Sequence, residues 1–233
     1  MQIKSIKIIV NPKKEWAIKL AKEVGLFLIQ NKFKISKQKA DLTICIGGDG
    51  TILYANHKDR IDGAILGIGS STSVVCILRN DNWKEKILDL IKSANVEKRL
   101  SLLCEFEGKK ISAINDVVIH SCDYRVIKIN LKINGETFEF QGDGVIISTP
   151  TGSTAYAYSA GGKTLSTVSR EIEIVPICPY KRTFETEITD QNSEIEIICD
   201  RGSALIIDGI FIGKVKPNQT IRVKKGEDVS FIV

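Results

Sequence analysis

The chain has 233 residues, of which 43% are hydrophobic and 26% are charged, and this composition excludes a disordered or fibrous protein. Its formal net charge of +5 is modest and spread along the chain, so it fits an anionic small ligand and predicts no nucleic-acid partner. No apolar run reaches the roughly 18 residues that a membrane span requires, and we expect no membrane partner.

Six cysteines are scattered through apolar segments, and none forms a Cys-x-x-Cys pair or stands at metal-ligand spacing with the two histidines. Such cysteines are typical of buried free thiols in a reducing compartment. The amino-terminal segment lacks a signal-peptide cleavage pattern. These features predict a cytoplasmic protein without a metal site built from its own side chains.

The first hundred residues alternate between strand and helix patterns. Strands that are separated by helices imply right-handed crossovers and a largely parallel sheet. We therefore predict a Rossmann-like α/β domain over residues 1–100. Its expected strands are residues 6–10, 42–46 and 64–68, and its expected helices are residues 15–30 and 83–94.

After about residue 100 the hydrophobic period changes to two. Residues 126–133 alternate between apolar and polar side chains, and Asn134-Gly135 then supplies a type I′ hairpin turn. The alternation returns at residues 194–197, and Asp208-Gly209 interrupts the apolar segment 205–211. This pattern predicts an antiparallel β-sandwich domain over residues 101–233.

The turn Gly47-Gly48-Asp49-Gly50-Thr51 follows an apolar strand and precedes a short helical stretch. Its glycines permit positive φ and close approach of the backbone, so the N–H groups can surround phosphate oxygens. Asp49 follows the carboxyl end of the strand, where open α/β sheets bind ligands. A carboxylate beside phosphates requires a metal ion or a proton transfer. The alternative is a tight turn in which Asp49 caps the helix.

Two further segments carry polar groups next to apolar strands. Asn115-Asp116 lies within an apolar strand segment, and such a pair can hold a ribose diol or a base edge through paired hydrogen bonds. An Asx-type turn explains the pair equally well. Asp143-Gly144 leads through an apolar run into Thr149-Pro150-Thr151-Gly152-Ser153-Thr154-Ala155-Tyr156, whose small polar residues expose N–H and hydroxyl groups.

Taken together, these segments and the following Ser159-Ala160-Gly161-Gly162 resemble the NAD kinases. The Gly-Gly-Asp-Gly-Thr turn is shared with lipid kinases and phosphofructokinases, whereas the Thr-Gly-Ser-Thr-Ala-Tyr block is far more specific. The matching segments extend from about residue 41 to residue 213. The chain is similar to a short, divergent, archaeal-like member of that family.

The resemblance implies a Rossmann-like domain joined to a β-sandwich. It also implies transfer of the γ-phosphoryl group of ATP, or of polyphosphate, to the adenosine-ribose 2′-hydroxyl of NAD, which gives NADP. The expected cofactor is Mg²⁺ held mainly by the substrate phosphates. The expected partners are NAD, ATP and further copies of the chain in a homodimer or homotetramer.

The resemblance implies residue roles as well. Asp49 is the implied general base, or the group that orients the 2′-hydroxyl. The donor phosphates are implied to lie against Gly47, Gly48, Gly50 and Thr51. Asp143 is implied to reach NAD that is bound mainly by a neighbouring subunit. The full set of implied NAD contacts is Asp49, Gly50, Asn115, Asp116, Asp143, Thr154, Ala155, Tyr156 and Ser159.

Three features depart from the family pattern. The segment 67–75 lacks the asparagine and two of the glycines of Gly-x-Asn-x-Gly-x-x-Gly-Phe, and Glu185-Thr186 stands where Arg-Pro or Lys-Pro is usual. Because the chain stops at Val233, we expect the family's C-terminal segment that returns to the first domain to be absent. Two alternatives therefore stay open: a non-catalytic dinucleotide-binding relative, and a kinase of another small metabolite or a lipid.

Overall fold

The computed structural model describes residues 2–58 and 60–233. Its contacts divide the chain into two compact units. The first unit comprises Met1–Lys98 together with Val229–Val233, and the second comprises Arg99–Asp228. Among the helices of the described residues, none is long and apolar enough to cross a membrane.

The first unit is built on a mostly parallel sheet, as the alternating pattern predicts. Its strand order is β2-β1-β3-β4-β19-β6, and β5 pairs with β4 outside this path. β3 is parallel to both β1 and β4, so the carboxyl ends of these three strands share one edge. The elements are β1 Ser5–Val10, α1 Glu15–Gln30, β2 Lys34–Ile35, β3 Leu42–Ile46, α2 Asp49–His57, β4 Ala64–Gly69, β5 Leu78–Arg79, α3 Trp83–Ser93, β6 Val96–Arg99 and β19 Val229–Ile232.

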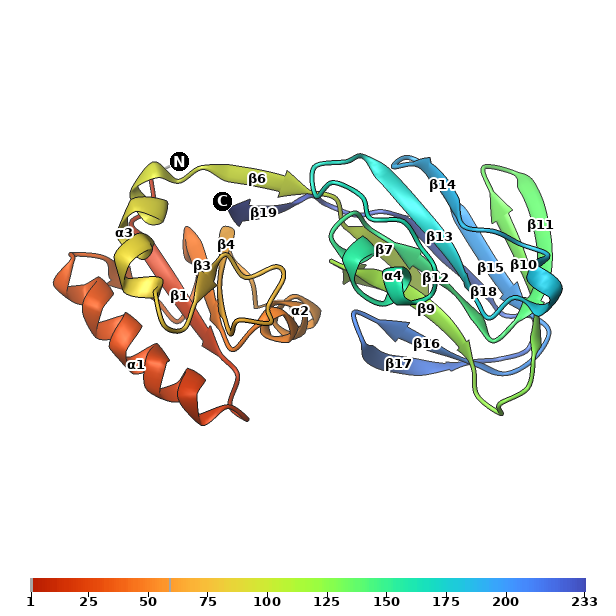
Figure 1. Ribbon diagram of the computed structural model, residues 1–233, viewed down its shortest axis with the longest axis horizontal. Helices are drawn as coiled ribbons and strands as arrows, with labels where there is room; N and C mark the ends of the chain where they lie inside the picture. The colour runs from red at the N-terminus through yellow and green to blue at the C-terminus, as the bar shows by residue number, and fades with distance from the viewer. Residues whose placement is uncertain (1, 59) are drawn as a thin grey trace. The chain divides into compact units, whose positions relative to one another are not determined.

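Helices cover both faces of this sheet, with α1 and α3 on one side and α2 on the other (Figure 1). The apolar stripe of α1 recurs at helical spacing and is buried at Ala17, Leu20, Val24 and Leu28. These side chains share a core with the buried side chains of α3. At its edge, Phe27 meets Trp83 edge-on at 5.4 Å between ring centroids.

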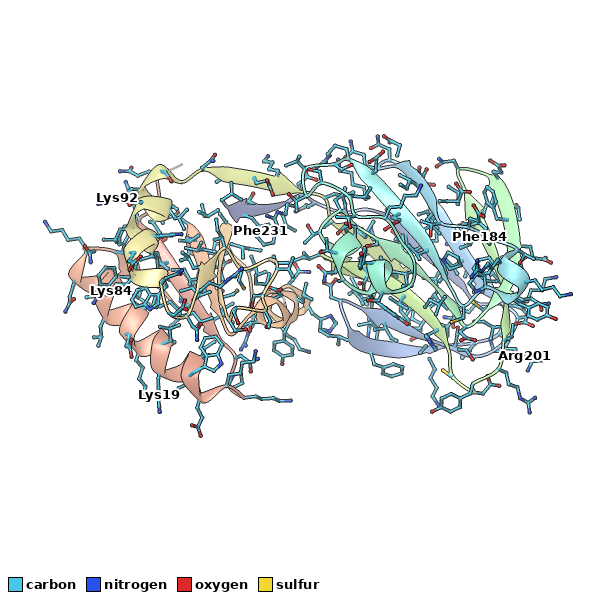
Figure 2. The ribbon with its side chains drawn as sticks, viewed as in Figure 1. Lys19, Lys84, Lys92, Phe184, Arg201 and Phe231 are labelled. Carbon is cyan, nitrogen blue, oxygen red and sulfur yellow. The ribbon has the colours of Figure 1, made fainter. Side chains whose placement is uncertain are left out.

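The last strand of the chain lies in the sheet of the first unit. β19 pairs in parallel with β4, and Phe231 lies opposite Ile65. Both Phe231, which is labelled in Figure 2, and Ile232 are 2% exposed. The expectation that no C-terminal segment returns to the first domain is therefore wrong. A strand of 4 residues with two buried side chains makes this return.

The second unit consists of two six-stranded antiparallel sheets, with strand orders β11-β10-β15-β18-β7-β8 and β14-β13-β12-β9-β16-β17. The elements are β7 Leu102–Phe106, β8 Lys109–Ala113, β9 Asp116–Ser121, β10 Ile127–Ile133, β11 Glu136–Gly142, β12 Gly144–Ser148, η1 Gly152–Thr154, α4 Tyr156–Ser159, β13 Glu171–Ile177, η2 Tyr180–Arg182, β14 Glu187–Asp190, β15 Ile195–Cys199, β16 Ser203–Ile207, β17 Ile210–Val215 and β18 Thr220–Lys225.

The alternation of apolar and polar side chains along the strands explains this sandwich. The inward residues of β10 and β13 belong to one core between the two sheets, and the hairpin turn at Asn134-Gly135 has positive φ at both residues. The chain passes repeatedly from one sheet to the other, and two of these crossings are short corners. One corner lies between β8 and β9, at residues 114–115, and the other is Asp143, between β11 and β12. Both corners carry residues that the sequence assigns to ligand binding.

Candidate active site

The glycine turn, Gly47–Thr51, lies at the carboxyl edge of the parallel sheet and leads into α2. Gly47 and Gly48 have φ values of 139° and 98°. A Cβ at Gly47 would lie only 2.5 Å from the Cβ of Asn11 and 2.6 Å from Oγ1 of Thr51, so a side chain does not fit there. Because α2 begins at Asp49, the start of the helix lies at this edge, and the Thr51 N–H already donates to the Gly48 carbonyl at 2.9 Å.

Lys14 places a positive charge on the glycine turn. Its Nζ donates to the carbonyl of Gly47 at 2.7 Å and lies 3.7 Å from the point where a Cβ of Gly48 would stand. An ammonium group has three donors, so further donors remain for a ligand. The sequence analysis missed this residue. The available signal was its place in Asn11-Pro12-Lys13-Lys14, directly after the first apolar strand.

A groove of about 540 Å³ opens beside the glycine turn. This volume is within the range of roughly 300–1,000 Å³ that small-molecule sites occupy. The ring of Tyr54 is 50% exposed, and Nζ of Lys58 lies 5.9 Å from its centroid. The groove thus combines an accessible aromatic ring with basic groups. Its lining residues are Ile9, Val10, Asn11, Pro12, Lys13, Gly50, Thr51, Tyr54 and Arg60.

The carboxylate of Asp49 is oriented by the loop that follows β4. One oxygen accepts the N–H of Val74 at 2.6 Å, and the other accepts those of Val75 and Cys76 at 3.1 and 3.0 Å. Burial raises the pKa of the Cys76 thiol, and the neighbouring Asp49 carboxylate raises that pKa further. Asp49 makes no side-chain cap to α2, whose N-cap residue is Gly48. The helix-cap interpretation of Asp49 therefore does not describe this structure.

The same loop packs closely on β4 and on the glycine turn. A Cβ at Gly67 would lie 2.7 Å from Sγ of Cys76, and a Cβ at Gly69 would lie 2.1 Å from Oγ of Ser73. Oγ of Ser73 also lies 3.2 Å from the Cβ position of Gly48. Gly67 and Gly69, the two glycines of the segment 67–75, thus let the loop fold back toward Asp49.

In the second unit, Asn115 and Asp116 belong to the corner between β8 and β9, which we call the 114–116 corner. This corrects the placement of the pair within one strand. The carboxylate of Asp208 accepts all three N–H groups of the corner, from Ile114, Asn115 and Asp116, at 2.9, 2.7 and 3.2 Å. Thr149 holds the opposite side, because its N–H donates to the Asn115 carbonyl at 2.8 Å and its hydroxyl donates to the Ile114 carbonyl at 2.6 Å.

The side chain of Asn115 is not used by this packing. Its Oδ1 is buried and has no hydrogen-bond partner among the described residues, and the same holds for Oγ1 of Thr151. Gly152 packs on the backbone of Asn115, since a Cβ there would lie 2.2 Å from the Asn115 carbonyl oxygen. An Asx-type turn requires Oδ1 to accept a backbone N–H, and Oδ1 of Asn115 accepts none. A buried amide oxygen in this state is available to a ligand.

Asp116 is a buried carboxyl group with a raised pKa. Burial raises the pKa of Asp116 to about 7, and the charge of Asp208 contributes to the rise. Burial also raises the pKa of Asp208 to about 6, although its three hydrogen bonds from the 114–116 corner oppose that rise. Two buried carboxylates with raised pKa values mark this corner as a functional-site candidate.

The residues after Thr149 present accessible groups next to the corner. Thr154, Tyr156 and Ser159 are exposed, and Ala155 is half-buried. Burial raises the pKa of the Tyr156 hydroxyl, and smaller contributions come from Cys178, Asp116 and Asp143. These contributions place the three groups within electrostatic reach of the Tyr156 hydroxyl.

The second corner fixes the backbone of Asp143, which donates its N–H to the Ile177 carbonyl at 2.9 Å and accepts the N–H of Ser121 at 2.8 Å. Cys122 and Cys178 follow the ends of β9 and β13 in this region and are exposed, so the expectation of uniformly buried cysteines is wrong for these two. All six cysteines are free. Among residues 2–58 and 60–233, no three His, Cys, Asp or Glu side chains form a group that could hold a metal ion.

The predicted site residues thus form two sets, and each set is brought together within its own unit. Gly47, Gly48, Asp49, Gly50 and Thr51 share the glycine turn of the first unit. The second set surrounds the two corners of the sandwich in the second unit and comprises Asn115, Asp116, Asp143, Thr154, Ala155, Tyr156 and Ser159. Besides Lys14, the sequence analysis missed the hydrogen bonds of Asp208, which it identified only as a turn residue.

Comparisons with known proteins agree with this arrangement. The family described as the ATP-NAD kinase C-terminal domain matches residues 114–233. The NAD kinase of Clostridium botulinum (strain Alaska E43) is 32% identical, and the match covers 96% of this chain and 88% of the relative. The NAD kinase of Clostridium perfringens (strain 13) is also 32% identical, over 99% of this chain and 93% of the relative.

Two solved structures share the fold. One is an NAD kinase from Archaeoglobus fulgidus in complex with ATP, with a TM-score of 0.81, 22% identity, and coverage of 98% of this chain and 92% of that chain. The other is yeast NADH kinase complexed with NADH, with a TM-score of 0.84, 21% identity, and coverage of 100% and 84%. The predicted fold class, a Rossmann-like domain followed by a β-sandwich, is confirmed. The chain belongs to the NAD kinase family.

Proposed function

We propose that this member of the NAD kinase family transfers the γ-phosphoryl group of ATP to the adenosine-ribose 2′-hydroxyl of NAD and so makes NADP. The observation that carries the proposal is the glycine turn. There a lysine ammonium, the N-terminus of α2 and one oriented carboxylate meet at the edge of a parallel sheet. Phosphoryl transfer requires this combination of charge neutralisation and positioning.

The donor is assigned to the groove beside the turn. The N–H group of Gly50 lines this groove and suits phosphate oxygens, and Lys13, Lys14 and Arg60 add positive charge. The half-exposed ring of Tyr54 suits the stacking of a purine base, which favours ATP over polyphosphate. Mg²⁺ is assigned to the phosphates themselves, because Asp49 is the single carboxylate in the glycine turn. The metal would neutralise phosphate charge.

Asp49 is assigned as the general base or as the group that orients the 2′-hydroxyl. As the 2′-oxygen forms its bond to the γ-phosphorus, the bond from that phosphorus to the β–γ bridging oxygen breaks and ADP leaves. The hydroxyl proton passes to the carboxylate. Three backbone donors hold this carboxylate in one orientation, which supports a role that depends on geometry.

NAD is assigned to the second unit. The unpartnered Oδ1 of Asn115 and the buried carboxyl of Asp116 suit ribose hydroxyls or a base edge. Thr154, Ala155, Tyr156 and Ser159 supply accessible surface beside them.

Asp143 is assigned to NAD that is bound mainly by a neighbouring subunit of a homodimer or homotetramer. Association through the sandwich is supported by β17, an edge strand on which Phe211 is 60% exposed. A cytoplasmic location is supported by the six free thiols.

The direct test is to incubate purified protein with NAD and Mg²⁺, adding either ATP or polyphosphate, and to measure NADP with an NADP-specific dehydrogenase. We expect NADP with ATP and little with polyphosphate. NAD binding without NADP formation from either donor would favour the non-catalytic relative. Absence of NAD binding would favour a kinase of another metabolite or of a lipid.

A further inference from the structure

Asp208 occupies the turn between β16 and β17 and reaches the 114–116 corner with both its backbone and its side chain. Its φ is 51°, and that of the following Gly209 is 75°, so the pair forms a left-handed turn that directs Asp208 back toward the sheet. The side chain is 7% exposed. Its backbone N–H donates to the Asp116 carbonyl at 3.0 Å, and its carboxylate accepts the three N–H groups of the corner.

Every backbone N–H and carbonyl group of the corner already has a hydrogen-bond partner within the protein. Asp208 takes every N–H, Thr149 takes the carbonyls of Ile114 and Asn115, and Asp208 takes the carbonyl of Asp116. The groups that remain are the side chains of Asn115 and Asp116. Their direction depends on the backbone, and one carboxylate holds three successive N–H groups of that backbone.

We propose that Asp208 is a positioning residue for NAD, which fixes the 114–116 corner so that the side chains of Asn115 and Asp116 face the bound dinucleotide. The inference rests on the proposed function, because that function assigns these two side chains to NAD. Loss of the carboxylate leaves buried N–H groups without partners, and the corner relaxes to recover hydrogen bonds elsewhere. The NAD site then loses its geometry while the donor groove, which lies in the first unit, keeps its own.

Asp208 also acts on Asp116 through its charge. The charged and titratable groups of this neighbourhood are Asp208 on the β16–β17 turn, Asp116 on β9, and Tyr156 on α4, whose hydroxyl senses Asp116, Asp143 and Cys178. Asp208 is the charged group that raises the pKa of Asp116. Neutralising Asp208 therefore lowers the pKa of Asp116, a shift that a purely structural role would not produce.

The test uses Asp208→Asn and Asp208→Glu, with Asp41→Asn as the matched control. Asp41 likewise accepts three hydrogen bonds, from the N–H groups of Lys4 and Ser5 and the hydroxyl of Ser5, but it precedes β3 at the sheet edge opposite the glycine turn. NAD affinity is measured by calorimetry from pH 5 to 9. Steady-state kinetics then gives separate KM values for NAD and ATP.

We expect Asp208→Asn to weaken NAD binding about tenfold or more, the effect of leaving buried donors unpaired. The KM for ATP should stay unchanged. The midpoint of the pH dependence of NAD affinity, set by Asp116 near pH 7 in the wild type, should move to lower pH. Asp208→Glu keeps the charge but lengthens the side chain by one methylene group, which changes the position of the carboxylate. It should therefore weaken NAD binding and leave the midpoint of the pH dependence unchanged.

Unchanged NAD affinity and an unchanged pH midpoint in Asp208→Asn would overturn the inference. Equal increases in the KM values for NAD and ATP would overturn it as well. If Asp208→Asn does not fold, wild-type affinity in Asp208→Glu is the overturning result. Asp41→Asn should bind NAD as the wild type does. If the wild type fails to bind NAD, the proposed function and the inference are overturned together. If the wild type binds NAD, the NAD site stands and the variants test the inference alone.

Discussion

The carboxylate of Asp49 accepts the backbone N–H of Val74 at 2.6 Å, and Val74 belongs to the segment that departs most from the family pattern. Three main-chain N–H groups of that loop, from residues 74–76, donate to the Asp49 carboxylate. Because main-chain donors do not depend on side-chain identity, the loop can lose its asparagine and glycines and still orient the carboxylate. The altered sequence is therefore compatible with activity.

Asn115→Ala should weaken NAD binding by about 1–3 kcal/mol, since polar groups of the ligand lose their partner. The buried Oδ1 of Asn115 has no partner within the described residues, so the substitution breaks no hydrogen bond made by that atom. Calorimetry with NAD measures the effect, and the KM for ATP should not change. Asn192→Ala, at an exposed position after β14, is the control. Equal NAD affinity in both variants would remove Asn115 from the site.

Lys14→Met should raise the KM for ATP about tenfold or more and leave the KM for NAD unchanged, because a charge-assisted hydrogen bond contributes roughly 1.5–3 kcal/mol. Methionine keeps the length of the side chain but loses the ammonium group that lies on the glycine turn. Lys19→Met, on the exposed face of α1, is the matched control (Figure 2). An unchanged KM for ATP would place the donor outside the groove.

The parts of the fold that were predictable from sequence are those in which a regular hydrophobic pattern continues over many residues. The stripe of α1 gives the helix Glu15–Gln30, and the alternation of β10 gives Ile127–Ile133. The two-residue strands β2 and β5 carry no period and were not predicted. The pairing of Phe231 with Ile65 joins distant parts of the sequence, so no local pattern indicates it.

In the candidate site, too, local sequence patterns do not indicate contacts between distant residues. Glycines and the Thr-Gly-Ser-Thr-Ala-Tyr block are local signals, and they were sufficient to find the glycine turn and the residues near the sandwich corners. Lys14 and Asp208 act through tertiary contacts with Gly47 and with the 114–116 corner. The sequence marks Asp208-Gly209 as a turn, but the direction of the Asp208 side chain depends on the strands that flank it.

The stability of the second unit should fall as pH rises from about 4 to 7. Burial raises the pKa values of Asp116 and Asp208 to about 7 and about 6, so the folded state binds more protons than the unfolded state in this range. Asp116→Asn removes one buried ionisation and should raise the Tm at pH 8 more than at pH 4. Calorimetric melting curves at both pH values measure this.

Asp41→Asn provides a control of opposite sign. Hydrogen bonds from the N–H groups of Lys4 and Ser5 lower the pKa of Asp41, so its contribution is present above the unfolded pKa and is lost as pH falls. This variant should lower the Tm at pH 8 and have less effect at acidic pH. A Tm gain of Asp116→Asn that does not depend on pH would contradict the assignment of a raised pKa to Asp116.

Asp143→Ala should lower NAD affinity without abolishing it, and the wild type should be a closed homo-oligomer. The edge strand β17 with its exposed Phe211 favours symmetric association through the sandwich. Light scattering at micromolar concentration, with and without NAD, measures the assembly. A persistent monomer that still makes NADP would show that Asp143 serves no neighbouring site.

The central claim is that Asp49 takes the proton during transfer to NAD, and the most direct measurement compares the rate of NADP formation in the wild type, Asp49→Asn and Gly69→Ala. A Cβ at residue 69 would displace Ser73 and so disturb the loop that orients the carboxylate, but this variant keeps the Asp49 carboxylate itself. We predict that Asp49→Asn binds NAD as the wild type does and loses at least ~10²-fold in turnover, while Gly69→Ala loses less. Near-normal turnover in Asp49→Asn would contradict the account.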